Sequence, residues 1–191
     1  MIDNVDAPPA SSGIDVPGSK ADDAVEGIGS LIENVDEFIK GNKSFDDVLD
    51  DYAEIYAEKI NSNKAWSWDD TIPGGENLSK SQRSLIKQQA IDSGLISEVP
   101  VNNADGLKYG FADFDSAGVV KETEYLPEDM WLMSDAKQFE WLNDQIGGAV
   151  DGYTWHHTEI PGKMELVPTG IHNITTHNGG RTVGLWADAK R

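Results

Sequence analysis

The sequence contains no cysteine among its 191 residues, which excludes disulfide bonds and thiolate metal sites. Any bound metal ion would therefore be held by His, Asp, Glu or Asn side chains. Long apolar runs are also missing. No stretch approaches the roughly 18 residues that a membrane-spanning helix needs, so we expect no membrane segment. The N-terminus has neither a basic start nor an apolar centre, and it does not match the pattern of a Sec-type signal peptide.

Basic residues are scarce, with 15 Lys and Arg against 34 Asp and Glu and a net charge of −19. This balance is unfavourable for binding nucleic acids, because proteins usually meet phosphate backbones with Lys and Arg. The charge is unevenly distributed, however. Residues 152–191 hold 3 acidic and 4 basic residues, and only this part of the chain is not strongly acidic. A divalent cation bound there would make the segment locally positive.

Composition and hydrophobic periodicity divide the chain into three parts. Residues 1–20 are rich in Pro, Gly and Ser, which predicts a disordered leader. Residues 21–64 predict an acidic helical hairpin, in which Gly41 and Asn42 end the first helix and Ser44 precedes the second. We expect the remaining residues, 70–191, to form one further domain.

The pattern within this further domain mixes helices with short strands. Ser79 and Gly94 bound an expected helix, and Ser134 is in position to cap another. The intervening stretch mixes turn residues with β-formers. The expected helices cover about residues 79–93 and 135–146, and the expected strands lie near 108–114 and 119–125. The overall prediction is an α+β fold with a mostly helical body.

All four histidines of the chain lie within residues 152–180, at positions 156, 157, 172 and 177. Histidine both ligates divalent metals and accepts a proton near neutral pH, so this concentration points to a metal or catalytic site. The segment begins with YTWHH, which predicts a strand, followed by a Pro-Gly turn and by MELV, a second strand. We expect Thr169 to cap a short helix, GIHNITTH, which Asn178 and two glycines would end.

A β-hairpin followed by a helix, with paired histidines ending the first strand and further histidines on the helix, resembles the metal finger of HNH/endonuclease VII nucleases. Trp155-His156-His157, the GKMELVP stretch, Ile171-His172 and HNGG at 177–180 are similar to the WHH family of that superfamily. Weaker similarity extends over about residues 70–185. The family consists of bacterial nuclease domains, commonly the toxic C-terminal parts of polymorphic toxins. The resemblance implies a ββα-metal, HNH-type finger at residues 152–180.

The resemblance also implies roles for the histidines. His157 would be the general base, and His156, His172 and His177 would hold one divalent metal ion, with Mg, Mn, Ni and Zn as candidates. One geometric problem remains, because residues five apart on a regular helix point roughly 140° apart, and His172 and His177 have this spacing. Asn173 and His177 are four apart and would share a face. Asn173 therefore stays a second candidate for the site.

The roles of the charged residues around the finger can also be considered. Lys163 and Arg181 either contact phosphate or are ordinary surface charges. Lys163 also stands where many HNH sites have asparagine. Asp113 is expected to be a structural hydrogen-bond acceptor.

The first functional hypothesis is a metal-dependent endonuclease that hydrolyses phosphodiester bonds, in DNA as the preferred substrate, with RNA not excluded. The family resemblance further suggests the toxic effector domain of an interbacterial toxin system, with a cognate immunity protein as partner. Such a protein would be made in the bacterial cytoplasm and delivered to a target cell by a specialised system. The alternative is a non-enzymatic protein-binding module with a structural metal site held by histidines. Structural zinc usually has four protein ligands, whereas catalytic zinc keeps a position open.

Overall fold

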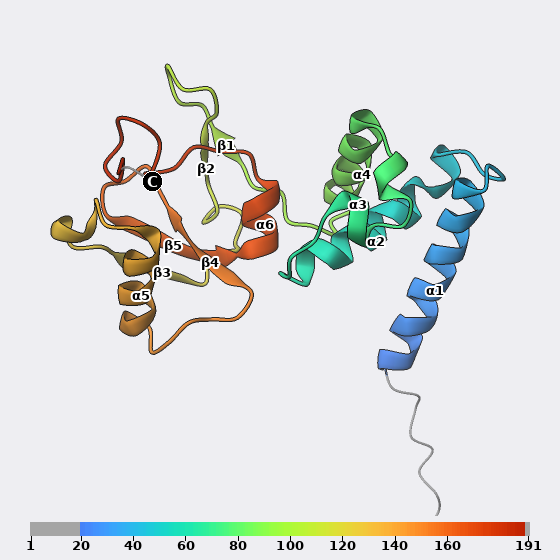
Figure 1. The fold of residues 1–191 in the computed structure, drawn as a ribbon, viewed down its shortest axis with the longest axis horizontal. Coiled ribbons are helices and arrows are strands. Elements are labelled where there is room, and N and C mark those ends of the chain that lie inside the picture. Colours follow the sequence, from blue (N-terminus) through green and yellow to red (C-terminus); the bar gives the residue numbers. More distant parts are fainter. Residues whose placement is uncertain (1–19, 190–191) are drawn as a thin grey trace, which may run out of the picture.

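The computed structural model describes residues 20–189, so the leader expected at residues 1–20 lies, apart from Lys20, outside the described residues. Figure 1 shows helices α1–α4 on one side of the molecule and the strands with α5 on the other, with α6 between them. This mixture of helices and small antiparallel sheets confirms the predicted α+β class. The α-helices are α1 Lys20–Ile39, α2 Leu49–Asn61, α3 Trp68–Thr71, α4 Lys80–Asp92, α5 Asp135–Gln145 and α6 Thr169–Ile174. The strands are β1 Val101–Asn102, β2 Phe111–Ala112, β3 Glu122–Tyr125, β4 Tyr153–His157 and β5 Lys163–Pro168.

Local sequence accounts for several of these boundaries. Ser79 accepts a hydrogen bond from the backbone of Gln82, whose side chain accepts from the backbone of Ser79, so a capping box starts α4. Gly162 adopts φ +79° in the turn between β4 and β5, a conformation that favours glycine. None of the helices within residues 20–189 combines the length and apolarity needed to cross a bilayer.

The predicted hairpin of β4 and β5 is present, with Trp155 opposite Leu166 and His157 opposite Met164. Strand β3 adds to the outer edge of β5, giving a three-stranded antiparallel sheet in the order β3-β5-β4. The sequence did not predict this third strand as part of the finger, because the two segments lie far apart in the chain. Strands β1 and β2 form a separate two-stranded sheet.

Two hydrophobic cores meet at strand β5. Because strand residues alternate between faces, Met164 and Leu166 pack towards α5, while Val167 joins the core of the helical side. Helix α2 supplies much of the core on the helical side and also contacts α4 and α6. Val167 and Ile171 of the finger therefore share one core with the predicted acidic hairpin.

Helix α6 differs from its prediction at both ends. Its N-cap residue is Pro168, so Thr169 is the first helical residue rather than the cap, and its backbone N–H donates to the carbonyl of Gly152. The helix ends at Ile174, and Thr175 is already extended (φ −87°, ψ 112°). The prediction of a helix reaching His177 was wrong, because Thr175 is the C-cap: its N–H still bonds the carbonyls of Ile171 and His172, but its extended ψ turns the following chain out of the helix.

The close approach of α2 and α6 yields a stability prediction. A Cβ added at Gly170 would lie 2.0 Å from the carbonyl oxygen of Ile60, which cannot move without shifting α2. We expect Gly170→Ala to lower the free energy of unfolding by about 1–3 kcal/mol, as is typical of overpacking. Denaturant-induced unfolding measures this loss.

Gly29→Ala is the matched control, because an added Cβ there meets nothing within 4 Å. Since alanine is the better helix former, this variant should be as stable as the parent or more stable by about 1 kcal/mol. Equal unfolding midpoints for the two variants would contradict the packing of α6 on α2.

Candidate metal and catalytic site

Three histidines from separate segments converge beside the finger. His156 comes from β4, His172 from α6, and His177 from the extended chain that follows α6. Their ring centroids are 4.8–5.5 Å apart. One potential ligand nitrogen from each ring lies within 4.8 Å of the others, and no other such group of metal-ligating side chains occurs among the described side chains of residues 27–189.

The early end of α6 removes the geometric problem posed by the sequence. His177 does not lie on the helix, so the 140° separation of residues five apart on a regular helix does not apply. His177 is held in its place by a hydrogen bond of 2.6 Å from Nδ1 to the carbonyl oxygen of Thr175. Because a carbonyl only accepts, Nδ1 carries the proton and the ring presents Nε2 as its lone-pair nitrogen.

The ring of Phe114 supports all three histidines. It is fully buried, stacks on His172 with an interplanar angle of 18°, and meets His156 and His177 edge to face. The loop that carries Phe114 is fixed by Asp113, which accepts hydrogen bonds from the backbone and hydroxyl of Ser116. Asp113 is thus the structural acceptor that the sequence predicted.

Burial keeps the three rings neutral. Desolvation lowers the pKa of His156 to about 2 and the pKa of His172 to about 4, and it also lowers the pKa of His177. The neighbouring histidines act in the same direction, because a second positive ring would be repelled. Near neutral pH each ring therefore offers a lone pair and no charge.

This arrangement fits a divalent cation. Nitrogens bound to one ion at about 2.1 Å can be at most about 4.2 Å apart, so the observed upper limit of 4.8 Å requires only small rotations of the rings. Metal-ligating histidines usually donate their second N–H to a carbonyl or similar acceptor, as His177 does. His172 also has such a partner, because it forms a hydrogen bond with the side chain of Asn173. This bond raises the pKa of His172, opposite to the effect of burial.

The fourth histidine, His157, points to the opposite face of β4 and joins a different network. Its Nε2 lies 2.7 Å from Oε1 of Gln138, a fully buried residue of α5. The amide of Gln138 is oriented unambiguously, because its nitrogen donates to the carbonyls of Met130 and Trp131 and its oxygen accepts from Arg181. Nε2 of His157 must therefore be a donor, and the lone pair of the neutral ring lies on Nδ1.

Both faces of β4 reach one cavity of about 450 Å³, which is lined by all four histidines together with Asp135, Phe139, Arg181 and the chain from Asn178. His156 and His157 can share it because they end their strand. Asp135 lies beside the fourth histidine, with Oδ1 3.9 Å from Nε2 of His157. The histidine rings thus lie close together and open into a shared cavity.

The other residues singled out in the sequence lie around this centre. Asn173 is exposed, stands next to His172 and lines a neighbouring cavity instead of joining the group of three. Lys163 pairs with Glu165 at 2.6 Å, and Arg181 pairs with Asp135 at 2.7 Å. Both cations therefore have a carboxylate partner within the fold.

Gln138 is the main residue that the sequence reasoning missed. It lies four positions before the buried Leu142, and so it occupies the inward face of α5. A polar side chain at that position was the available signal, since buried polar groups are nearly always hydrogen-bonded and often hold a site in place.

Comparison with known proteins agrees with this geometry. Residues 144–187 match the model of the WHH family, described as a nuclease of the HNH/ENDO VII superfamily with conserved WHH. The matched segment contains Trp155-His156-His157 and all four histidines, and it supports a nuclease function. It does not include residues 70–143, where the weaker similarity stays a prediction. Neither a search of curated proteins nor a search of solved structures gave a match.

Opposite tautomers of two histidines provide a test of these networks. In the metal-free protein, we expect His157 to carry its proton on Nε2 and His177 on Nδ1, because each of these nitrogens donates to an acceptor-only oxygen. Long-range ¹⁵N–¹H correlation spectra near neutral pH distinguish the two forms.

Gln138→Leu is the companion variant. It should remove the Nε2–H preference of His157, leave His177 unchanged, and lower the free energy of unfolding by about 1–3 kcal/mol, because buried donors lose their acceptor. An Nδ1–H tautomer at His157 in the parent protein would refute the network.

Proposed function

We propose that this protein is a metal-dependent endonuclease that hydrolyses phosphodiester bonds, with DNA as its substrate. The observation that carries the proposal is the cavity into which three neutral imidazoles and a fourth, separately held histidine all open. The match of this segment to a nuclease family supports the reaction class. His156, His172 and His177 would hold the cation, which when bound supplies Lewis-acid stabilisation of the phosphate and the leaving oxygen.

His157 is the proposed general base. With Nε2–H donated to Gln138, its Nδ1 takes a proton from a water molecule. The water oxygen forms a bond to phosphorus, and the bond between phosphorus and the leaving sugar oxygen breaks. Asp135, 3.9 Å from Nε2, stabilises the charged ring that results. Asn173 is proposed as a positioning residue that orients His172 through its side chain.

The donor set bears on the identity of the ion. Magnesium prefers oxygen ligands, whereas imidazole suits zinc and nickel. A site built from three imidazoles therefore favours Zn²⁺ or Ni²⁺ over Mg²⁺. Three protein ligands also leave at least one coordination position for water or phosphate, which favours an enzyme over a structural zinc module.

The biological setting follows from the family resemblance. We propose the toxic effector domain of an interbacterial toxin system, made in the bacterial cytoplasm and delivered to a target cell by a specialised system. A cognate immunity protein would protect the producer. The acidic surface would then serve partner binding or delivery, while the near-neutral segment at 152–191 meets the substrate.

Cleavage of supercoiled plasmid DNA across a panel of Mg²⁺, Mn²⁺, Ni²⁺ and Zn²⁺ tests the function. We expect nicking that requires added metal. His157→Ala should lower the rate by about 10²- to 10⁴-fold, the usual contribution of a general base.

Tyr125→Ala serves as the control, because this residue is exposed on β3 outside the cavity. Its rate should equal that of the parent. A parallel assay on RNA separates the two substrates. Plasmid left intact with every metal would refute the nuclease proposal, and a His157→Ala variant of unchanged rate would refute the role of the base.

A further inference from the structure

A second cavity lies beside the first, on the other side of α6. It has a volume of about 270 Å³ and is walled by aromatic and basic side chains. Consecutive residues of α6 line the two cavities: His172 lines the first, and Asn173 lines the second. The lining residues are Tyr56, Trp66, Trp68, Arg83, Lys87 and Asn173, together with Ser84 and Ile174.

The aromatic wall is built in a defined order. Tyr56, which is buried, stacks on Trp68 at 5.0 Å with an interplanar angle of 8°. Trp66 meets both rings edge to face, at 5.3 Å and 5.6 Å. The two indoles are only partly buried, so Tyr56 supports them from the core while they reach the cavity. Indole rings fixed in this way need little further ordering to receive a planar ligand.

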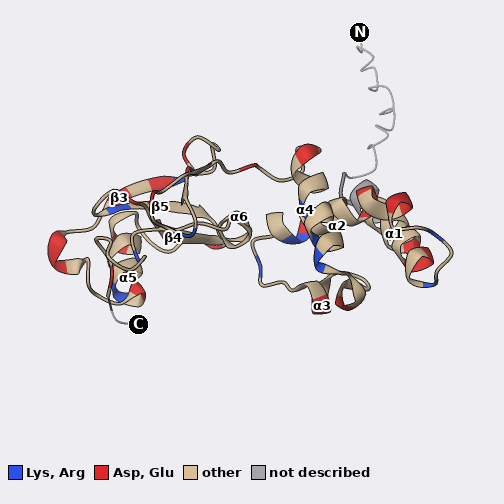
Figure 2. Cartoon of the chain, turned by 90° about the horizontal axis from the view of Figure 1, so that it is seen from above, with Lys and Arg blue, Asp and Glu red and all other residues tan. Residues whose placement is uncertain are grey.

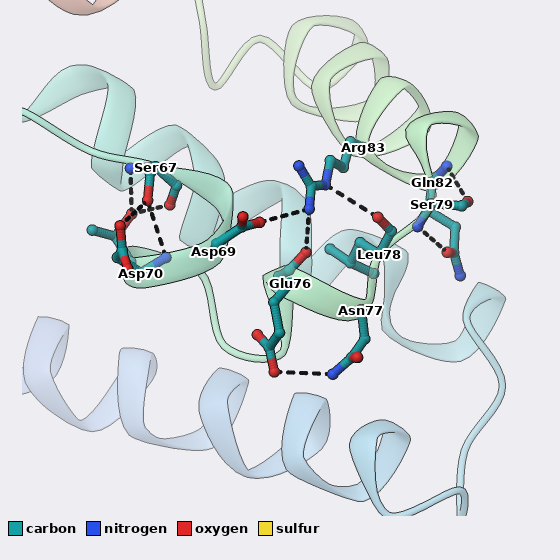
Figure 3. A network of polar contacts seen from close by, with 11 residues as sticks. Ser67, Asp69, Asp70, Glu76, Asn77, Leu78, Ser79, Gln82 and Arg83 are labelled. Atoms are coloured by element: carbon teal, nitrogen blue, oxygen red, sulfur yellow. Dashed lines mark hydrogen bonds and ion pairs between the residues drawn. The ribbon is translucent and has the colours of Figure 1, made fainter.

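Two cations from α4 complete the wall. The guanidinium of Arg83 is held by Asp69 and by the carbonyl of Leu78 (Figure 3). It also donates to the carbonyl of Gly75 and lies 5.6 Å from the ring of Trp68. Lys87 donates to the carbonyl of Ile174 at 2.6 Å, which ties α4 to α6. Asp69 balances the charge of Arg83, whereas Lys87 bonds only a neutral carbonyl here and so favours an anionic ligand over a cationic one.

Trp66 also lines a further cavity, of about 440 Å³, together with Lys64 and the ion pair of Lys59 and Glu58. Basic side chains thus occur on both sides of this tryptophan. Figure 2 shows Lys and Arg close to α2 and α4, with acidic residues at α3 and along α1. Carboxylates balance two of these cations, because Glu58 pairs with Lys59 and Asp69 pairs with Arg83, so Lys64 and Lys87 are the cations on which an anionic ligand would depend.

We propose that Trp66 and Trp68 form a subsite for an unpaired nucleotide of the substrate, next to the catalytic cavity. The base stacks on an indole, and Lys64 and Lys87 attract the adjoining phosphates. Aromatic faces within a basic groove are the combination that binds single-stranded nucleic acid without reading its sequence. The inference rests on the proposed nuclease function, which it extends from the metal centre to the neighbouring strand.

Binding of a short fluorescein-labelled oligodeoxythymidine to the metal-free full chain, followed by fluorescence anisotropy, tests the subsite without cleavage. Trp66→Ala should raise Kd by about 5- to 150-fold, the effect of losing one base-stacking contact. Trp66→Phe retains an aromatic face and should recover part of the affinity. Tyr125→Ala, which removes an exposed aromatic ring elsewhere, should bind like the parent. Melting curves establish that each variant is folded.

Lys64→Gln provides a second test of the subsite, and this substitution leaves the aromatic residues unchanged. Lys64 is exposed and lines the cavity next to Trp66, whereas Lys80, which is also exposed, lines none of the cavities described above. Lys64→Gln should reduce the slope of log Kd against log salt concentration by about 0.7, and Lys80→Gln should not.

Unchanged affinity in folded Trp66→Ala, or an unchanged salt slope in Lys64→Gln, would overturn the subsite and leave the tryptophans as packing residues. These outcomes are distinct from failure of the nuclease proposal. If the protein cuts plasmid but binds the oligonucleotide independently of Trp66, it lacks the subsite. If binding depends on Trp66 but plasmid stays intact with every metal, the protein is not the proposed nuclease.

Discussion

The candidate site depends on the point at which the chain leaves helical geometry after Ile174. On a longer helix, His172 and His177 would point away from each other, and no single ion could contact both. The turn at Thr175 brings His177 back beside His172, and the carbonyl of the same residue fixes the ring of His177 through Nδ1. Phe114 then fills the space beneath the three rings. The convergence of His177 with the other two imidazoles, and the orientation of its ring, follow from this one change of backbone direction.

The period of the β-strand provides the second constraint. Consecutive residues of β4 face opposite sides, so His156 joins the three-histidine group while His157 faces α5. The adjacent positions are therefore held by unrelated networks, one of aromatic rings and one centred on the buried amide of Gln138. Separate support suits separate roles, because a ligand must keep its lone pair on the ion whereas a base must exchange a proton with water.

The sequence was sufficient for the features that depend on local pattern. The strand ending in His156 and His157, the turn at Gly162, and the capped helix after Ser79 follow from alternation, turn residues and capping, and the structure contains all three. The α+β class followed from the same patterns. The pairing of β3 with β5 and the burial of Gln138 depend on contacts between distant segments, which local patterns do not encode. The early end of α6 was missed because Asn178 and the glycines after it were taken as the end of the helix, whereas the backbone becomes extended at Thr175.

The central claim is that three imidazoles share one cation. X-ray absorption spectroscopy at the metal edge of protein loaded with one equivalent of Ni²⁺ or Zn²⁺ tests it most directly. The account predicts three histidine nitrogens at about 2.0–2.1 Å, with the remaining positions filled by oxygen donors that lack the outer-shell scattering of an imidazole ring. In His172→Ala the spectrum should lose one imidazole. A spectrum without imidazole scattering, or one that is the same in the parent and in His172→Ala, would contradict the claim.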